Sequence, residues 1–328
     1  MSPAHSEPRF DVLALGHAIV DVISHVDDVA VAGLGLAKGT MTVVDEARAK
    51  EIYAVMGPAV EISGGSAANT AVGVASLGGT ASFAGRVADD DFGAVFRHDV
   101  DAAGVDFYAA PGPVAGATAR CHILVTPDAQ RTMGTHLGVA ATLGAGDIDP
   151  AVPAAAAVSY LEGFLVGTPG EEAVRALAEA SRRAGRRVAL TLSDPSWLGL
   201  HRDAFDSLLD GADVLFANEA EALAFTGAGD VDGALALLRG RCPVVTVTLS
   251  ERGALVAGPS GEPEAVPAHP VERVVDTTGA GDLYAAGFLF GLAREEPLRR
   301  CAELGALAAS EVISHDGGRP AVPLRNLL

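Results

Sequence analysis

The residues best suited to chemistry lie between Val274 and Leu292, where a glycine-rich turn meets a helix without charge. Val274 and Val275 predict the end of a strand, and small or turn-forming residues follow. Asp282 then precedes a run of ten uncharged residues, 283–292, which predicts a buried helix. The stretch therefore places a carboxylate in the first turn of a buried helix.

This arrangement predicts phosphoryl transfer to an alcohol. The first N–H groups of a helix have no partner within it and carry partial positive charge, so they favour an anion. We expect Asp282 to take the proton of an attacking hydroxyl. The N–H groups of Gly279, Ala280 and Gly281 are expected to hold the charge of the transferring phosphoryl group.

The tetrapeptide Gly-Ala-Gly-Asp is weak evidence by itself, because it occurs three times in a chain with 39 glycines. The copy at 144–147 runs into Ile-Asp-Pro, and the copy at 227–230 precedes an ordinary amphipathic helix. The copy at 279–282 alone has Asp-Thr-Thr before it and a wholly apolar helix after it. That context distinguishes it from a helix-capping Asp.

Asp276 to Asp282 and the following helix resemble the C-terminal signature of the ribokinase/PfkB carbohydrate kinase family. Gly64 to Gly79, Gly-Gly-Ser-Ala-Ala-Asn-Thr-Ala-Val-Gly-Val-Ala-Ser-Leu-Gly-Gly, resembles its N-terminal signature. The two signatures stand in the family's order, and the resemblance covers nearly the whole chain. Within the family, the chain is most similar to the adenosine-kinase-like branch.

The elements that must position these residues follow a regular rhythm from about residue 155 onward. Strands are predicted at 156–161, 188–193, 212–217 and 244–249, and helices at 170–184, 195–209 and 298–313. Alternating strands and helices predict an α/β fold with a parallel sheet covered on both faces, whose ligands bind at the carboxyl ends of the strands. The resemblance implies a ribokinase-like sandwich forming one catalytic domain, 1–328, with a small β lid from about 17–45 and 105–137.

The resemblance also implies an acceptor site. Asp21 follows the first strands and is expected to grip two sugar hydroxyls, since a carboxylate accepts two hydrogen bonds. Gly64, Gly65 and Asn69 are expected to hold the same diol, because a buried Asn in a small apolar helix needs partners. Phe164, in Leu161-Glu-Gly-Phe164, is expected to stack on a base.

The nucleotide side is implied by a second group of residues. Asn218 and Glu221 form a capping-box pattern, and in this family the same pair organises Mg²⁺ and phosphate through water. Thr248, Gly253 and Gly317 are expected along the nucleotide; Gly253 also suits a plain hairpin turn.

A monovalent cation is a further expectation from the resemblance. In many relatives the turn that contains Asp276 and Thr278 wraps a potassium ion together with a loop like Ser314 to Gly318. Asp276 could instead bond its own turn, a common habit of Asp. The roles of His17, where many relatives have Asn, and of Arg131 stay unassigned.

Composition excludes several other functions. The formal net charge of −19 argues against nucleic acid, which basic patches bind. Lysine occurs only at Lys38 and Lys50, so no P-loop is present. No apolar run reaches the roughly 18 residues of a membrane span. Residues 1–8 are polar, so we expect no signal peptide, and three scattered cysteines suit a reducing cytoplasm.

We therefore predict an ATP- and Mg²⁺-dependent kinase that phosphorylates a primary hydroxyl of a ribose-containing acceptor, with adenosine, giving AMP, as the first choice. A free sugar, a sugar phosphate, inosine and guanosine are alternatives. A non-catalytic relative that binds sugar and nucleotide is an alternative of another class, but such a protein has no reason to keep Asp282. Monomer and homodimer are both open.

Overall fold

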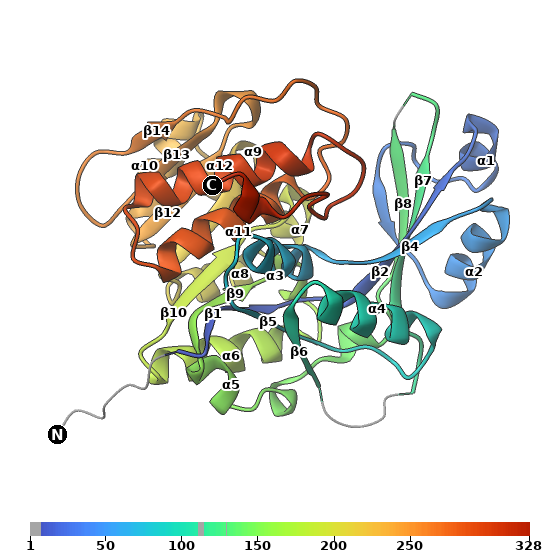
Figure 1. Ribbon diagram of the computed structural model, residues 1–328, viewed down its shortest axis with the longest axis horizontal. Coiled ribbons are helices and arrows are strands. Elements are labelled where there is room, and N and C mark those ends of the chain that lie inside the picture. The colour runs from blue at the N-terminus through green and yellow to red at the C-terminus, as the bar shows by residue number, and fades with distance from the viewer. Residues whose placement is uncertain (1–7, 111–114, 129) are drawn as a thin grey trace.

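The computed structural model describes residues 8–110, 115–128 and 130–328. Residues 1–7, on which the expectation about a signal peptide rests, lie outside the described residues. Two sheets organise the described chain, one of nine strands and one of five (Figure 1).

The nine-stranded sheet has the order β14-β13-β12-β11-β10-β9-β1-β5-β6. Pairing is parallel from β6 to β12, and β13 and β14 add an antiparallel edge. Its strands are β1 (Phe10–Leu15), β5 (Ala81–Gly85), β6 (Val105–Ala109), β9 (Ala156–Leu161), β10 (Arg187–Thr191), β11 (Val214–Asn218), β12 (Val244–Thr248), β13 (Ala254–Ala257) and β14 (Glu264–Val266).

Helices cover both faces of this sheet, as the alternation of strands and helices predicts (Figure 1). One face packs against α3 (Ser66–Ser76), α4 (Asp91–Ala102), α11 (Ala280–Ala293) and α12 (Leu298–Val312). The other packs against α5 (Ala151–Ala154), α6 (Glu171–Arg183), α7 (Pro195–Leu200), α8 (Arg202–Leu209), α9 (Glu219–Thr226) and α10 (Val231–Arg239). Short 3₁₀ turns lie at Gly138–Thr142, Ala145–Asp147, Gly163–Leu165, Ser250–Arg252 and Leu324–Asn326.

Helix α11 is buried along its length because it lies between α3, α12 and the sheet. Every residue from Leu283 to Leu292 is buried. The contact with α12 is close: a Cβ at Gly287 would lie 2.3 Å from the carbonyl oxygen of Leu304. The predicted buried helix is thereby confirmed.

The five-stranded sheet has the order β3-β8-β7-β2-β4 and projects beside the larger one (Figure 1). Its strands are β2 (Ile19–His25), β3 (Met41–Val43), β4 (Val60–Gly64), β7 (Ala119–Val125) and β8 (Arg131–His136). Helices α1 (Asp28–Gly33) and α2 (Glu46–Val55) cover one face, where Val31, Leu34, Ile52 and Leu124 form a small core. We call this sheet with α1 and α2 the lid.

Several elements differ from the sequence prediction. The helix expected at 195–209 is two helices, because the chain turns at His201 (φ −126°, ψ 28°). Val274 and Val275 do not form a strand; the amide of Val275 donates to Ile313 O at 2.8 Å instead. The five-stranded sheet includes β4, while β6 lies in the large sheet, so its extent differs from 17–45 and 105–137.

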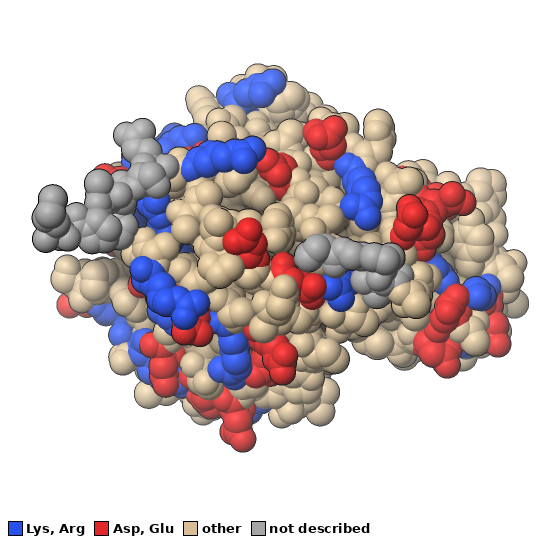
Figure 2. Space-filling model, turned by 90° about the horizontal axis from the view of Figure 1, so that it is seen from below, with Lys and Arg blue, Asp and Glu red and all other residues tan. Residues whose placement is uncertain are grey.

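The surface charge is mixed despite the acidic total. On the face shown in Figure 2, acidic and basic side chains are interspersed. No helix in the described part of the chain is both long enough and apolar enough to cross a membrane.

Candidate active site

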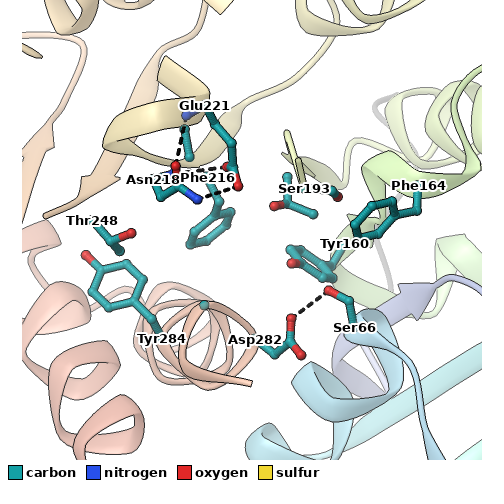
Figure 3. A pocket seen from close by; sticks show the side chains of 13 residues that line it. Ser66, Tyr160, Phe164, Ser193, Phe216, Asn218, Glu221, Thr248, Asp282 and Tyr284 are labelled. Carbon is teal, nitrogen blue, oxygen red and sulfur yellow. Dashed lines mark hydrogen bonds between the residues drawn. The ribbon is translucent and has the colours of Figure 1, made fainter. Parts of the chain in front are cut away.

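A cavity of about 250 Å³ opens where the carboxyl ends of β9, β10, β11 and β12 meet the start of α11. It brings two predicted catalytic residues, Gly281 and Asp282, into one space with Asn218, Glu221 and Thr248 (Figure 3). Its lining residues are Ser66, Tyr160, Phe164, Thr191, Ser193, Phe216, Ala217, Asn218, Glu221, Thr248, Gly281, Asp282 and Tyr284.

Asp282 is held at the floor of this cavity by two side chains of α3. Its Oδ1 accepts a hydrogen bond from Ser66 Oγ at 2.6 Å, and its Oδ2 accepts one from Asn69 Nδ2 at 2.9 Å. Thr70 Oγ1 donates to its backbone carbonyl at 3.2 Å. The two predicted signatures, far apart in sequence, thus meet at this carboxylate.

The electrostatics of Asp282 suit a proton acceptor. Burial raises its pKa to about 6, and the nearby Glu162 adds to the rise, while the bonds from Ser66 and Asn69 oppose it. A base is most effective when its pKa lies near the working pH. Asp282 is therefore ionised at neutral pH and a stronger base than an ordinary aspartate.

The turn before α11 enters the helix through a glycine. Gly279 is left-handed (φ 76°), and a Cβ there would lie 2.7 Å from Gly318 Cα, so this position needs glycine. The Ala280 amide, predicted to face the phosphoryl group, donates to Thr277 O at 3.2 Å. The amides of Gly279 and Gly281 are the other two that the helix start offers.

Asn218 and Glu221 form the predicted capping box at the start of α9. Glu221 accepts from Asn218 N at 3.0 Å and from Asn218 Nδ2 at 2.6 Å, and its own amide donates to Asn218 Oδ1 at 2.8 Å (Figure 3). Burial raises the pKa of Glu221 to about 7, and the charge of Asp194 adds to the rise. Glu221 lines the cavity, and a carboxylate whose charge is disfavoured by burial fits a Mg²⁺ ion held through water.

Four of the residues predicted for the acceptor, Asp21, Gly64, Gly65 and Asn69, lie at the junction of the two sheets, whereas Phe164 lines the cavity with Asn218, Glu221 and Thr248. Asp21 on β2 packs against Gly64 on β4, where a Cβ would lie 2.3 Å from its Oδ2. Burial raises the pKa of Asp21 to about 7, which the charges of Arg319 and Arg131 oppose. Gly65 is left-handed (φ 93°), and a Cβ there would meet His17 O at 2.4 Å.

One of the two polar side-chain atoms of Asn69 has no hydrogen-bond partner among the described residues. Its Nδ2 bonds Asp282, whereas its buried Oδ1 has no partner among the described residues. An unpaired buried acceptor is costly and is commonly satisfied by a ligand. This oxygen suits a donated hydroxyl hydrogen of an acceptor.

The structure places four further predicted residues in three different surroundings. Phe164 and Thr248 line the cavity. Gly253 (φ 87°) turns the β12–β13 hairpin, where a Cβ would lie 2.1 Å from Val266 O, so packing alone explains this glycine. Gly317 is not among the cavity-lining residues; its amide donates to Asp276 Oδ2 at 2.8 Å.

The side chains of Asp276 and Thr278 do not fit a potassium ion. Asp276 Oδ1 accepts from the Thr278 amide at 3.0 Å, and its Oδ2 pairs with Arg131 Nη2 at 2.5 Å. Thr278 Oγ1 accepts from Arg131 Nη1 at 2.6 Å. The side-chain oxygens of both residues thus already face a guanidinium in place of a potassium ion.

Sequence reasoning missed several buried polar residues around this site. Glu162, at the end of β9, accepts from the Ala67 amide at 3.1 Å and lies 3.3 Å from His17 Nδ1, so it caps the start of α3. Arg319 donates to Ser63 O at 3.1 Å and to Ala68 O at 3.4 Å. Ser193 has a strained left-handed backbone (φ 70°) and a buried hydroxyl without a partner among the described residues. The position of Ser193 at the end of the strand predicted at 188–193 was the available signal.

A parallel sheet that presents a buried carboxylate beside a helix N-terminus defines a ribokinase-like phosphotransferase with an alcohol acceptor. The model of the pfkB carbohydrate kinase family matches residues 40–325. The chain belongs to the pfkB family of carbohydrate kinases. The family predicted from the two signatures is thereby confirmed.

Solved structures of relatives match almost the whole chain. The crystal structure of an adenosine kinase from Sinorhizobium meliloti is 46% identical, with a TM-score of 0.90 over 97% of this chain and 98% of that one. A probable sugar kinase from Rhizobium etli CFN 42 is 42% identical, with a TM-score of 0.91 over 98% of each chain. A fructokinase from Klebsiella pneumoniae is 33% identical over 72% of this chain and 79% of its own length.

Proposed function

We propose that this kinase transfers the γ-phosphate of ATP to the primary hydroxyl of a nucleoside, with adenosine as the acceptor and AMP as the product. The similarity to the Sinorhizobium meliloti adenosine kinase supports this choice. The similarity to a probable sugar kinase and to a fructokinase keeps a sugar as the alternative. The choice between them depends on what lies beside the acceptor hydroxyls.

The observation that carries the proposal is the apolar inner face of the lid. Side chains alternate along strands, so Ile19 and Ile23 share a face with Asp21. Register extends this face across β7 and β8, where it has an apolar cluster: Cys121, Ile123 and Val125, with Ile19, Ile23 and Met133 packed against them. A free sugar has hydroxyls on every side, whereas a nucleoside offers a flat base that could pack on such a face.

The proposed reaction uses residues of this chain at each step. Asp21 and Asn69 Oδ1 accept hydrogen bonds from the ring hydroxyls and so orient the primary hydroxyl. Asp282 accepts its proton late in the transfer, since a loose transition state makes positioning more important than basicity. The Gly279 and Gly281 amides stabilise the charge on the moving phosphoryl group.

The nucleotide is proposed to extend from this turn toward Asn218, Glu221 and Thr248. When bound, Mg²⁺ neutralises the phosphate charge, and Glu221 would hold it through water. Asp194 lies near enough to act on the pKa of Glu221 and would contribute to the same charge balance. Closure of the lid would exclude water and prevent futile hydrolysis of ATP.

The remaining proposals concern context. We place the enzyme in the cytoplasm, in purine salvage, which suits its three buried free thiols, Cys121, Cys242 and Cys301. Its partners would be ATP and a small acceptor. Monomer and homodimer both accommodate a site whose residues all come from one chain.

An acceptor panel tests the proposal. Purified protein with ATP and Mg²⁺ would be given adenosine, inosine, guanosine, cytidine, ribose and fructose, and ADP release would be measured together with the phosphorylated product. We expect the highest kcat/KM with adenosine and AMP as its product. Higher kcat/KM with fructose or ribose would refute the nucleoside assignment and favour the sugar alternative.

A further inference from the structure

We infer that Arg131 of the lid supplies the positive charge that orders the turn before α11, so that turnover needs no monovalent cation. The guanidinium reaches from the start of β8 to two residues of that turn. Its Nη2 lies 2.5 Å from Asp276 Oδ2, and its Nη1 donates to Thr278 Oγ1 at 2.6 Å. These two residues are separated from Gly279 by no more than two positions.

The contacts of Asp276 explain why one cation suffices here. Oδ1 accepts from the Thr278 amide at 3.0 Å, and Oδ2 accepts from the Gly317 amide at 2.8 Å as well as pairing with Arg131. The carboxylate therefore ties three segments together: the turn, the 314–318 loop and the lid. A potassium ion bound to the same oxygens would have to approach a guanidinium of like charge.

Burial makes this pair difficult to replace. The Arg131 side chain is 12% exposed and that of Asp276 is 8% exposed. A buried charge without its partner is strongly unfavourable, so removal of the arginine destabilises the turn beyond the loss of one contact. The turn in question supplies the Gly279 and Gly281 amides, and small displacements of such donors are costly for the rate.

The same arginine joins the acceptor side to the phosphoryl side. Arg131 pairs in register with Val125 on β7, and Cys121 on β7 lies beside Asp21 on β2. All four positions are on the inner face of the lid. Arg131 is thus a positioning residue: it holds the lid strand that carries the acceptor site against the turn that forms the anion hole.

The test compares Arg131→Gln, Arg131→Lys and a matched control, Arg120→Gln. Arg120 is also a buried lid arginine, but it lies on the opposite face of β7 over the ring of Phe92. Rates would be measured at saturating ATP and Mg²⁺, in potassium and in tetramethylammonium at constant ionic strength. The inference rests on the phosphotransferase activity of the site but not on which acceptor is used, so any acceptor that turns over serves.

We expect the unmodified enzyme to have the same kcat in both salts. Arg131→Gln should lower kcat by about tenfold or more with a smaller change in the acceptor KM, Arg131→Lys should keep an intermediate rate, and Arg120→Gln should keep most of it. A potassium-dependent rate in the unmodified enzyme, full activity of Arg131→Gln, or an equal loss in Arg120→Gln would each overturn the inference.

A second measurement needs no acceptor. A cation that binds the folded state raises the melting temperature. We expect the unmodified protein to melt at the same temperature in potassium and in tetramethylammonium, and a potassium-specific increase would contradict the inference. If no acceptor in the panel is phosphorylated, the nucleoside proposal fails, while this measurement still decides whether the folded protein binds potassium.

Discussion

Asp282 combines two hydrogen bonds that favour its ionised form with burial that opposes it, and burial prevails. We expect Asp282→Asn to lower kcat by about 10²-fold or more, because the amide cannot accept the proton. ATP binding, measured by calorimetric titration, should change little, since Asn keeps the shape of the side chain. If the variant retained most of its turnover, another group would be the base.

The raised pKa of Asp282 also has a consequence for stability. Its pKa is about 6 in the folded protein against an ordinary value of 3.8. The folded state therefore binds this proton more tightly, so Asp282 adds stability as pH falls through 6 toward 4 and costs stability above pH 6. At pH 8 we expect Asp282→Asn to raise the free energy of unfolding by about 1 kcal/mol, after allowance for the partial exposure of the side chain. The variant should therefore melt at a higher temperature.

Thermal unfolding of the variant and the unmodified protein across pH 4 to 8 checks this linkage. The difference between the two should shrink steadily as pH falls from 6 to 4, because Asp282 becomes protonated in the folded state over that range. A difference that stayed constant with pH would mean that the carboxylate is not destabilising in the folded protein.

Substitutions of Asp21 and Asn69, the residues proposed to hold the acceptor, should have different effects on binding and on kcat. Asp21→Asn should weaken acceptor binding by about tenfold or more, with little effect on ATP, because it removes the charge proposed to face the ring hydroxyls. Asn69→Ala should weaken acceptor binding and also lower kcat, since Asn69 Nδ2 holds Asp282. Titration of both ligands with each variant measures this, and equal losses for ATP and acceptor would indicate structural roles.

The sequence predicted features correctly where a residue bonds or packs with residues close to it in the chain. The capping box of Asn218 and Glu221 and the buried helix from Leu283 onward follow from local spacing. The fold class followed from alternation, and the family from two signatures. The residues that were missed bond across long separations: Glu162 caps a helix that begins at residue 66, and Arg319 bonds Ser63. No periodicity reports such pairs.

At the scale of elements, Glu221 of helix α9 has two roles: it caps the helix, and it is proposed to hold Mg²⁺ through water. Glu221→Gln keeps one of the two bonds that Glu221 accepts from Asn218, so the unfolding free energy should change by no more than about 1 kcal/mol. The Mg²⁺ concentration for half-maximal rate should rise several-fold, because charge is lost beside the proposed metal. A Mg²⁺ titration of the rate measures this.

Glu219→Gln is the matched control for that experiment. Glu219 lies in the same first turn of α9 but points to Arg252 at the surface. Its substitution should leave the Mg²⁺ curve unchanged. If both variants shifted the curve equally, the effect would reflect the helix N-terminus as a whole and not Glu221.

At the scale of the molecule, the two sheets supply different parts of the proposed site. The large sheet fixes Asp282, the turn before it and the cavity at its carboxyl edge. The lid contributes Asp21 and Arg131 from its inner face, while α1 and α2 cover its outer face. Acceptor choice is therefore expected to reside in the lid, and phosphoryl transfer in the turn before α11, which Arg131 of the lid contacts.

Residues on the two opposite faces of the lid sheet can test whether acceptor choice resides in the inner face. Met133 is partly buried on the inner face, beside Ile123, whereas Leu124 points outward into the core with Ile52. Met133→Ser should raise the adenosine KM about fivefold, since removal of a half-buried Met costs about 1 kcal/mol of apolar contact. The ATP KM should stay constant.

Leu124→Ala is the control on the outer face. It should lower the melting temperature, because it leaves a cavity in the core, and it should leave the adenosine KM unchanged. If Met133→Ser did not affect the adenosine KM, the inner face of the lid would not contact the base.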